Sequence, residues 1–381
     1  MDVLTENPII LDHHQLIVDN PTTIKYDVKM IGVNKQMITN HKIIIGNSNN
    51  ISDIEAKSVH LIVTSPPYPM IAMWDEIFSD QNPEIREALD KNDGNKAFEL
   101  MHELLDGVWK ECDRVLVDNG FVCINIGDAT RTINGVFQLY SNHTAIINSF
   151  LKMGYCVLPD VHWRKQTNAP NKYMGSGMYP AGAYVTYEHE YILIFRKGGK
   201  RVFKGERKQD RQESAFFWEE RNEWFSDLWE LKGTAQKIGV DNVSRKRSAA
   251  YPFEIPYRLI NMYSAKNDTV LDPFVGLGTT CIASIVAQRN SIGIEIANDI
   301  AEMAVSFLEV EVNEVNDLID DRLNKHIKFI NGLPAEKKEN CYNNKNHGFK
   351  VRTKQEMAIK IQKLNSLRRE DMSIICDYIA D

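Results

Sequence analysis

Short apolar runs alternate with longer amphipathic stretches along the first half of this chain. The apolar runs have the length and composition of buried strands, and they lie at residues 42–45, 59–63, 120–128, 155–163 and 190–195. Between them, residues 83–117 and 144–153 repeat apolar side chains at helical spacing. Strands that alternate with helix-length segments predict an α/β architecture with a largely parallel sheet.

The pattern changes after residue 199 and again near residue 248. The region between is crowded with aromatic side chains and with charges of both signs. Residues 268–280 then predict a strand, a glycine turn and a helix capped by Thr279 or Thr280. Beyond residue 310 the charged sequence favours helices to the end. We therefore divide the chain into an N-terminal extension (1–40), two parts of one α/β domain (41–199 and 249–310), an inserted region (200–248) and a helical C-terminal extension (311–381).

Composition and charge narrow the cellular setting. No apolar run approaches the roughly 18 residues that a membrane span needs, and the acidic N-terminus does not resemble a signal peptide. The six cysteines are scattered without a CxxC pair, which argues against a zinc site or a disulfide framework. We therefore expect a cytoplasmic protein with no metal and no membrane contact. The formal charge of −7 gives no hint of nucleic acid, although it leaves room for a local basic groove.

The first candidate for chemistry directly follows the apolar run at 59–63. Ser65, Pro66, Pro67 and Tyr68 place a hydroxyl and an aromatic ring on either side of two prolines. The prolines fix φ and remove two backbone donors, so the strand end is held rigidly. A hydroxyl that accepts from an amine, beside a ring that stacks on the base, suggests chemistry on a nucleobase. For the two prolines alone, a plain strand-ending turn is the simpler interpretation.

The second candidate is the glycine turn around Gly276 and Gly278, where a ligand can approach the backbone closely. A dinucleotide site would need a third small residue at the position of Cys281, and it is absent. Glu295 lies 19 residues after Gly276, a separation at which a carboxylate accepts both hydroxyls of a ribose. A nucleoside bound without its phosphates, with Asp272 free to face a cationic group, suggests S-adenosylmethionine. A generic βα unit is the alternative for the glycine turn alone.

In this order, residues 64–68 and 272–280 resemble the catalytic and cofactor motifs of the β group of amino-DNA methyltransferases. Further segments similar to that family lie at 119–128, 163–165, 187–191 and 251–260, and the resemblance covers roughly residues 41–310. Adenine-modifying relatives usually carry aspartate or asparagine at the position of Ser65, so the serine suggests the cytosine-N4 branch. The family usually carries Gly-Asp where this chain has Gly46 and Asn47, so the charge near the cofactor differs.

The resemblance implies a circularly permuted, Rossmann-like methyltransferase sheet that binds S-adenosyl-L-methionine, with a target-recognition region inserted at 200–248. It implies a cytosine flipped out of double-stranded DNA as substrate, and a cognate restriction endonuclease as a genetic rather than physical partner. The cofactor residues that it implies are Asn47, Pro252, Asp272, Phe274, Gly276, Gly278, Thr279 and Glu295.

The expected mechanism places two acceptors on the hydrogens of a cytosine amine, because they stabilise the positive charge that develops on its nitrogen. We predict that these acceptors are Ser65 Oγ and the Pro66 carbonyl, and that Tyr68 stacks on the extruded base. The inserted region would hold DNA phosphates. Its candidate cations are Lys204, Arg207, Lys208, Arg211, Arg245, Lys246 and Arg247.

Three other functions compete with this prediction. An adenine-N6 methyltransferase of the same group is the nearest, because a serine does not strictly fix the base. A nicotinamide-dependent oxidoreductase would use the same βα turn but leaves Ser65 to Tyr68 unexplained. A non-catalytic DNA-binding module explains neither motif.

Overall fold

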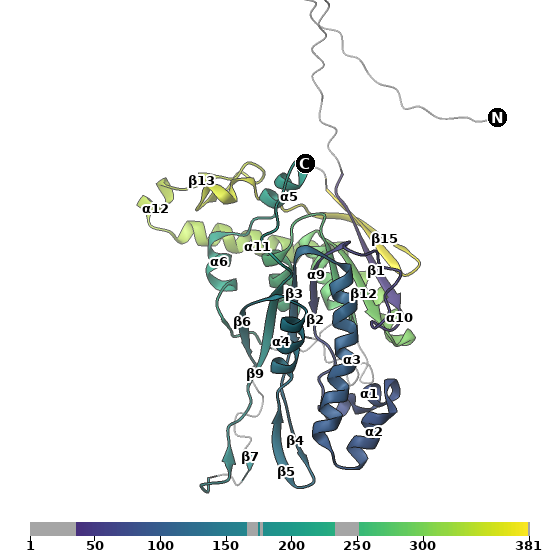
Figure 1. The fold of residues 1–381 in the computed structure, drawn as a ribbon. Helices are drawn as coiled ribbons and strands as arrows, with labels where there is room; N and C mark the ends of the chain where they lie inside the picture. The colour runs from purple at the N-terminus through teal and green to yellow at the C-terminus, as the bar shows by residue number, and fades with distance from the viewer. Residues whose placement is uncertain (1–35, 166–173, 176–177, 233–250, 380–381) are drawn as a thin grey trace, which may run out of the picture. The chain divides into compact units, whose positions relative to one another are not determined.

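A ten-stranded sheet organises the residues that the computed structural model describes, namely 36–165, 174–175, 178–232 and 251–379 (Figure 1). Its strand order is β10-β6-β9-β3-β2-β11-β12-β1-β16-β15. The five central strands run parallel. They are β3 (Leu116–Ile126), β2 (Val59–Thr64), β11 (Thr269–Asp272), β12 (Asn290–Glu295) and β1 (Ile38–Ile45). The predicted α/β class with a largely parallel sheet is therefore confirmed.

Strands from the two halves of the sequence are neighbours at the centre of the sheet. Val270 and Leu271 of β11 pair with Leu61 and Ile62 of β2, although about 200 residues separate the two strands. Because the strands are parallel, their carboxyl ends lie at the same edge of the sheet. In open α/β sheets, ligands bind at this edge where the strand order reverses. The topology thus brings the two sequence motifs together.

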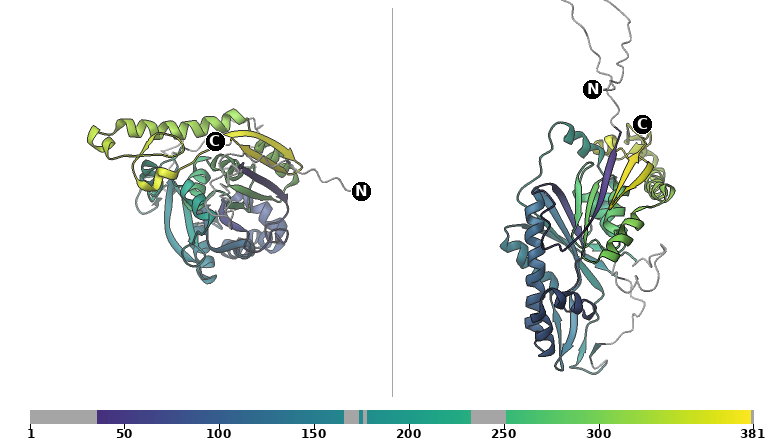
Figure 2. Two further views of the ribbon diagram at one scale, coloured as in Figure 1. Left: turned by 90° about the horizontal axis from the view of Figure 1, so that it is seen from above. Right: turned by 90° about the vertical axis from the view of Figure 1, so that its right-hand side faces the viewer.

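Helices cover both faces of the sheet (Figure 2). Leu61 packs on the side of α8 (Glu254–Tyr263), α9 (Thr279–Ala287) and α10 (Asn298–Leu308). Ile62 faces the other way, toward α3 (Gly94–Val115) and α4 (Asn142–Lys152). Successive side chains of a strand point to opposite faces, so a strand buried on both faces reads as one apolar run. No helix among the described residues is long and apolar enough to cross a membrane.

The other end of the sheet is antiparallel. Strand β9 (His189–Arg196) pairs with β3 and with β6 (Cys156–Arg164), and β10 (Leu228–Trp229) adds the last edge. Two hairpins extend beyond this part, β4 (Ala129–Ile133) with β5 (Val136–Tyr140), and β7 (Met174–Gly175) with β8 (Ala183–Tyr184). The remaining short helices before β11 are η1 (Ala72–Trp74), α1 (Asp75–Gln81), α2 (Pro83–Asp90), α5 (Glu206–Glu213) and α6 (Trp218–Trp224).

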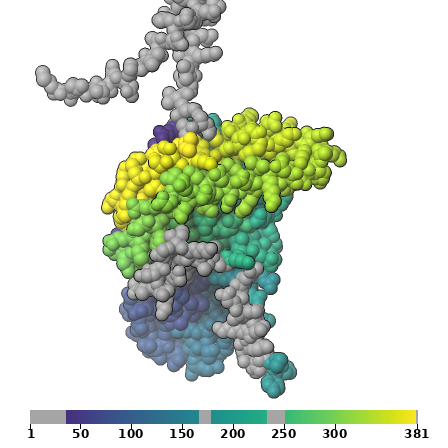
Figure 3. All heavy atoms as spheres, turned by 180° about the vertical axis from the view of Figure 1, so that it is seen from behind, coloured from purple at the N-terminus to yellow at the C-terminus, as the bar shows by residue number. Residues whose placement is uncertain are grey.

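The prediction of a helical C-terminal extension is wrong beyond about residue 342. Helices α11 (Val312–Gly332) and α12 (Ala335–Glu339) are present, but they are followed by strands β13 (Tyr342–Asn343), β14 (Lys350–Val351), β15 (Leu364–Glu370) and β16 (Ser373–Tyr378), with η2 (Lys354–Ala358) between. Strand β16 pairs with β1, and Tyr378 donates to the carbonyl of Ile285 at 2.8 Å. Without β16, strand β1 would be an edge strand with unpaired backbone groups. Figure 3 shows these C-terminal segments gathered at one end of the visible face.

Residues 83–117 are mostly helical, as predicted, and a short break divides them into α2 and α3. Asn92 has a positive φ of 58°, which ends the first helix. Asp93 then caps α3, because its side chain accepts from the backbone N–H of Lys96 at 3.0 Å. The apolar spacing continues across the break, so periodicity alone does not reveal it.

Candidate active site

A cavity of about 670 Å³ lies at the carboxyl ends of β2 and β11, and both predicted motifs line it. This volume falls within the range of about 300–1,000 Å³ that is usual for small-molecule sites. The lining includes these predicted site residues: Asn47, Ser65, Pro66, Pro67, Tyr68, Asp272, Phe274, Gly276, Thr279 and Glu295. Two predicted cofactor residues, Gly278 and Pro252, are not part of this lining, whereas Tyr251, next to Pro252, is.

Asp272 connects the two motifs. Its Oδ1 accepts from the Thr64 hydroxyl at 2.6 Å, and its Oδ2 accepts from the Thr280 hydroxyl at 2.5 Å. The backbone N–H of Phe274 also donates to Oδ1 at 3.0 Å. The expectation that Asp272 is free is therefore corrected, because three neutral donors already hold its carboxylate. Burial raises the pKa of Asp272 to about 6, although these donors act in the opposite direction.

The glycine turn owes its shape to two positive φ angles. Gly276 has φ 51° and Gly278 has φ 88°, which L-residues with a side chain rarely adopt. Gly278 occupies the N-cap of α9, and no side chain caps that helix. The prediction that Thr279 or Thr280 caps it is therefore wrong. Thr280 instead donates to Asp272, so its hydroxyl fixes the turn to the end of β11.

Glu295 ends β12 beside the glycine turn. Its Oε1 accepts from the backbone N–H of Ala297 at 3.0 Å, and burial raises the pKa of the carboxyl above its usual value. Asn47, which follows β1, also lines the cavity, and its amide donates to Gln81 at 3.0 Å. A carboxylate and amide oxygens next to a positive-φ glycine turn fit the ribose and adenine of a nucleoside.

The catalytic motif is part of a polar network on the antiparallel side of the cavity. Tyr68 donates to Oε2 of Glu190 at 2.9 Å, and its hydroxyl lies 3.1 Å from Ser65 Oγ. Asn125 donates to the Tyr68 hydroxyl at 2.8 Å and to Glu190 at 2.7 Å. The Lys165 ammonium pairs with the other oxygen of Glu190. Burial and the neighbouring Glu190 charge raise the pKa of Tyr68 well above its ordinary value.

Sequence reasoning did not assign a role to Asn125, Lys165 or Glu190, although all three line the cavity. They come from β3, from the end of β6 and from β9, which are paired antiparallel strands. Each of the three lies in a segment that resembles the family. For Glu190, the sequence signal is a single carboxylate at the start of an otherwise apolar strand. Glu190 is only 7% exposed, and a buried carboxylate needs partners such as these.

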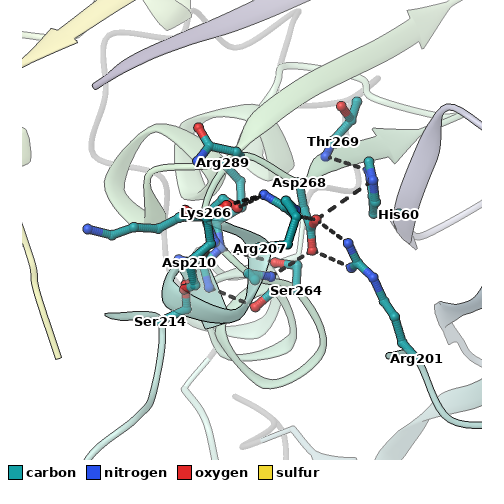
Figure 4. A network of polar contacts seen from close by, with 12 residues as sticks. His60, Arg201, Arg207, Asp210, Ser214, Ser264, Lys266, Asp268, Thr269 and Arg289 are labelled. Atoms are coloured by element: carbon teal, nitrogen blue, oxygen red, sulfur yellow. Dashed lines mark hydrogen bonds and ion pairs between the residues drawn. The ribbon is translucent and has the colours of Figure 1, made fainter. Parts of the chain in front are cut away.

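The predicted DNA-contacting cations of α5 lie at the opposite edge of the sheet. Arg207 donates to Asp210 at 2.5 Å and pairs with Asp268, which directly precedes β11 (Figure 4). Asp268 therefore marks the amino end of the strand whose carboxyl end carries Asp272. We revise the prediction for Arg207 accordingly, because its guanidinium is taken up by an internal ion pair. This arrangement separates α5 from the cavity by the length of β11.

The other predicted DNA-contacting cations lie partly near α5 and partly outside the described residues. Lys204 and Lys208 are exposed near α5, and the Arg211 guanidinium lies 5.2 Å from the ring centroid of Phe203. They share the amino edge of the sheet with Arg207, so we also revise the prediction that they contact DNA. Arg245, Lys246 and Arg247 lie outside the described residues. Among the described residues, the Lys or Arg that lines the cavity is Lys165.

Comparison with known proteins gives consistent matches. The DNA methylase family of N6 and N4 methyltransferases matches residues 59–306. The chain is 52% identical over 328 residues to the type II methyltransferase M.MthZI of Methanothermobacter thermautotrophicus, covering 85% of this chain and 91% of that protein. It is 47% identical over 307 residues to the type II methyltransferase M.MjaI of Methanocaldococcus jannaschii, covering 77% and 97% of the two chains.

Solved structures share the fold. One is a DNA modification methylase of Thermus thermophilus in complex with S-adenosyl-L-methionine, with a TM-score of 0.55, 28% identity, and coverage of 70% of this chain and 93% of that one. Another is the cytosine-N4-specific PvuII DNA methyltransferase, with a TM-score of 0.52 and 18% identity, covering 75% of this chain and 93% of that one. At that identity the second likeness shows the fold alone.

Proposed function

Because this protein belongs to the DNA methylase family of N6 and N4 methyltransferases, we propose that it methylates the exocyclic N4 amine of a cytosine flipped out of double-stranded DNA. The methyl donor is S-adenosyl-L-methionine, which the family uses. The observation that carries the choice of cytosine is Ser65, a neutral hydroxyl at the start of the catalytic motif, lining the same cavity as Asp272 and Glu295.

The residues present fit this donor. Glu295 offers a carboxylate to the ribose hydroxyls, and the turn at Gly276 lets the adenosine approach the backbone. Asp272 is buried beside the cavity and can offset a positive charge there when it is ionised. When bound, S-adenosyl-L-methionine supplies a methyl group on a cationic sulfur. Asp272 and Glu295 are thus the residues that would hold its cationic and ribose parts.

The catalytic motif would hold the target amine. An exocyclic amine is a poor nucleophile, because its lone pair is delocalised into the ring. Ser65 Oγ and the Pro66 carbonyl accept its two hydrogens and stabilise the developing positive charge. The base must leave the duplex to reach this cavity. Positioning of the amine then contributes much of the rate.

We propose that Tyr68 both stacks on the extruded base and belongs to the polar network around Ser65. A Cβ placed on Gly127 would lie 3.0 Å from the Tyr68 ring, so the ring packs against that backbone. Its hydroxyl is held by Asn125 and Glu190. Both contacts fix the ring plane, and a fixed ring can present one face to an extruded base. The same contacts make Tyr68 part of the polar network around Ser65.

An adenine-N6 methyltransferase is the second candidate, since the family includes both activities. The two are separated by digesting plasmid DNA from cells that express the protein and identifying its nucleosides by mass. We expect N4-methylcytosine, which DNA from cells with the empty vector lacks. N6-methyladenine in place of N4-methylcytosine would show that the protein is an adenine-N6 methyltransferase. By family resemblance, we also propose that the modification protects DNA from a restriction endonuclease encoded alongside.

A further inference from the structure

Glu190 is a buried carboxylate on β9 that methyl transfer, as described above, does not use. Its Oε2 receives hydrogen bonds from the Tyr68 hydroxyl at 2.9 Å and from the Asn125 amide at 2.7 Å. Its Oε1 is paired with the ammonium group of Lys165. Placing a carboxylate in a buried position is costly unless partners compensate for the lost water. Such a group beside the catalytic serine therefore calls for an explanation.

The hydrogen-bond donors in this network have a fixed direction. An ionised carboxylate only accepts, so the Tyr68 hydroxyl must donate its proton to Glu190. The Tyr68 oxygen can then accept, and Ser65 Oγ lies 3.1 Å away with a proton to give. The pKa of Tyr68 is raised, first by burial and then by the Glu190 charge, so the hydroxyl keeps its proton at neutral pH. The chain of donors therefore runs from Ser65 through Tyr68 to Glu190.

This direction has a consequence for the serine. When its proton points toward Tyr68, a lone pair of Ser65 Oγ is left to face the cavity. The amide of Asn125 approaches Ser65 Oγ at 3.4 Å, which is a weak contact. The Ser65 oxygen is thus prepared to accept a hydrogen bond from an amine. Without Glu190, the hydroxyl could rotate and present its proton to the amine instead.

We propose that Glu190 is a positioning residue for methyl transfer, which acts on Ser65 through Tyr68 and receives the proton that the amine loses. Because Ser65 holds the amine only under the function proposed above, the role of Glu190 depends on that proposal. The Glu190 carboxylate lies on β9, outside the motif that carries Ser65. The hydroxyl groups of Tyr68 and Ser65 connect it to the place proposed for the amine.

The proton balance of the reaction supports a carboxylate at this place. Methyl transfer forms a carbon–nitrogen bond and breaks the sulfur–methyl bond, so the amine nitrogen becomes positively charged. One of its protons moves to Ser65 Oγ as the serine proton moves to Tyr68 and the tyrosine proton moves to Glu190. Both hydroxyls end the step neutral, and Glu190 carries the proton. Lys165, whose side chain is 43% exposed, connects the protonated carboxyl to solvent, where the proton is released.

The test compares Glu190→Gln with Glu188→Gln in the full-length protein. Glu188 lies two residues earlier and pairs with Arg164 at the surface, outside the cavity lining, so it is a matched control. Single-turnover methyl transfer is measured at saturating S-adenosyl-L-methionine and DNA, together with the affinity for each. We expect Glu190→Gln to slow transfer about 100-fold, the lower end of the contribution of a positioned proton-transfer group. Both affinities should stay within about twofold of the unmodified protein.

A second variant, Tyr68→Phe, breaks the same chain at its middle. We expect the double variant to be no slower than Glu190→Gln alone, because groups that act as one unit lose their effects together. Glu190→Asp, which keeps the carboxylate, should recover part of the rate. Near-normal single-turnover transfer by Glu190→Gln, or multiplied losses in the double variant, would overturn the proposal.

Ser65→Ala separates the two levels of this interpretation. If Ser65→Ala is inactive while Glu190→Gln is fully active, only the role of Glu190 fails. If Ser65→Ala is itself fully active, the proposed chemistry at Ser65 is wrong. The proposed role of Glu190 is then wrong as well, because it acts through Ser65. A Glu190→Gln protein that has lost its affinity for S-adenosyl-L-methionine would indicate a structural role, which also contradicts the proposal.

Discussion

Two aspartates at opposite ends of one short strand have opposite electrostatic environments. Asp268 directly precedes β11 and Asp272 ends it, and both are buried. Burial raises the pKa of the Asp268 carboxyl, but the Arg201 guanidinium and neighbouring charges outweigh it, and the pKa is lowered overall. In the part of the chain that the structure describes, the donors to Asp272 are neutral, the hydroxyls of Thr64 and Thr280 among them, and burial raises the pKa of Asp272 to about 6.

The difference shows how one strand serves both stability and function. At the amino edge, Arg201 donates to Asp268 through two hydrogen bonds of 2.6 Å, and Arg207 adds a third hydrogen bond. The charge of Asp268 is thereby neutralised inside the protein. At the carboxyl edge, the described residues that donate to Asp272 are all neutral. Under the proposed function, the charge of Asp272 would offset the cationic sulfur of the methyl donor.

The largest effect on stability should come from removing the buried ion pair at the amino edge of the sheet. Asp268→Asn leaves two guanidinium groups without their buried partner, and removal of one partner from a buried ion pair typically costs about 3–5 kcal/mol. We expect a loss of this size in the free energy of unfolding, measured by urea denaturation. Asp320→Asn removes an exposed partner of Lys363 and should change the stability little. Equal losses in the two variants would contradict the contrast between buried and exposed pairs.

The next effect concerns catalysis at the carboxyl edge. Ser65→Ala removes one acceptor of the target amine, and loss of a single such stabilising group usually lowers kcat about 100- to 1,000-fold. Asp268 lies outside the cavity lining, so methyl transfer per folded molecule should be unchanged in Asp268→Asn. The check is single-turnover methyl transfer, corrected for the folded fraction. Unchanged transfer by Ser65→Ala would remove the serine from the reaction.

A smaller effect should appear in the pH dependence of stability. The pKa of Asp272 in the folded protein, about 6, lies above its ordinary value of 3.8, so folding favours the protonated form. The ligand-free protein should therefore lose about 3 kcal/mol of stability from Asp272 as pH rises from about 3 to 7, at 1.36 kcal/mol per pKa unit. Urea denaturation of Asp272→Asn, compared with the unmodified protein across this range, isolates the contribution. A stability difference between the two proteins that does not change with pH would contradict it.

The smallest effect is expected at Lys204 and Lys208. Both are exposed near α5, at the edge of the sheet opposite the cavity. The double change Lys204→Ala, Lys208→Ala should leave the DNA dissociation constant unchanged. The dependence of affinity on salt should also keep its slope, because each phosphate contact that is lost lowers that slope by about 0.9. A slope lowered by about two contacts would show that α5 does meet DNA.

The sequence predicts the centre of the molecule well, because each central strand is a local apolar run followed by a distinctive turn. Residues 59–68 and 268–280 carry their own strand, turn and helix signals, and parallel pairing then brings the two turns together. The α/β class and the family follow from these local signals. The cavity also contains most of the residues that the two motifs predict.

The rest depends on contacts between distant segments. Strand β16 is stabilised by pairing with β1, which lies more than 300 residues earlier in the chain. The sequence of β16 alone does not indicate this pairing. The polar network around Tyr68 forms only when the antiparallel strands β3, β6 and β9 come together. Their pairing brings Asn125, Lys165 and Glu190 into contact. The ion pair of Arg207 with Asp268 could not be predicted from the sequence, because 61 residues separate the two.

The most direct test of the central claim is methylation of a defined duplex by the purified protein with S-adenosyl-L-methionine, followed by mapping at single-base resolution. We predict that N4-methylcytosine appears at one cytosine within each copy of a short recurring sequence, and that the Ser65→Ala protein forms it at least about 100-fold more slowly under the same conditions. Methyl groups on adenine N6, or on cytosine with undiminished yield from the Ser65→Ala protein, would contradict the assignment of Ser65 to the cytosine amine.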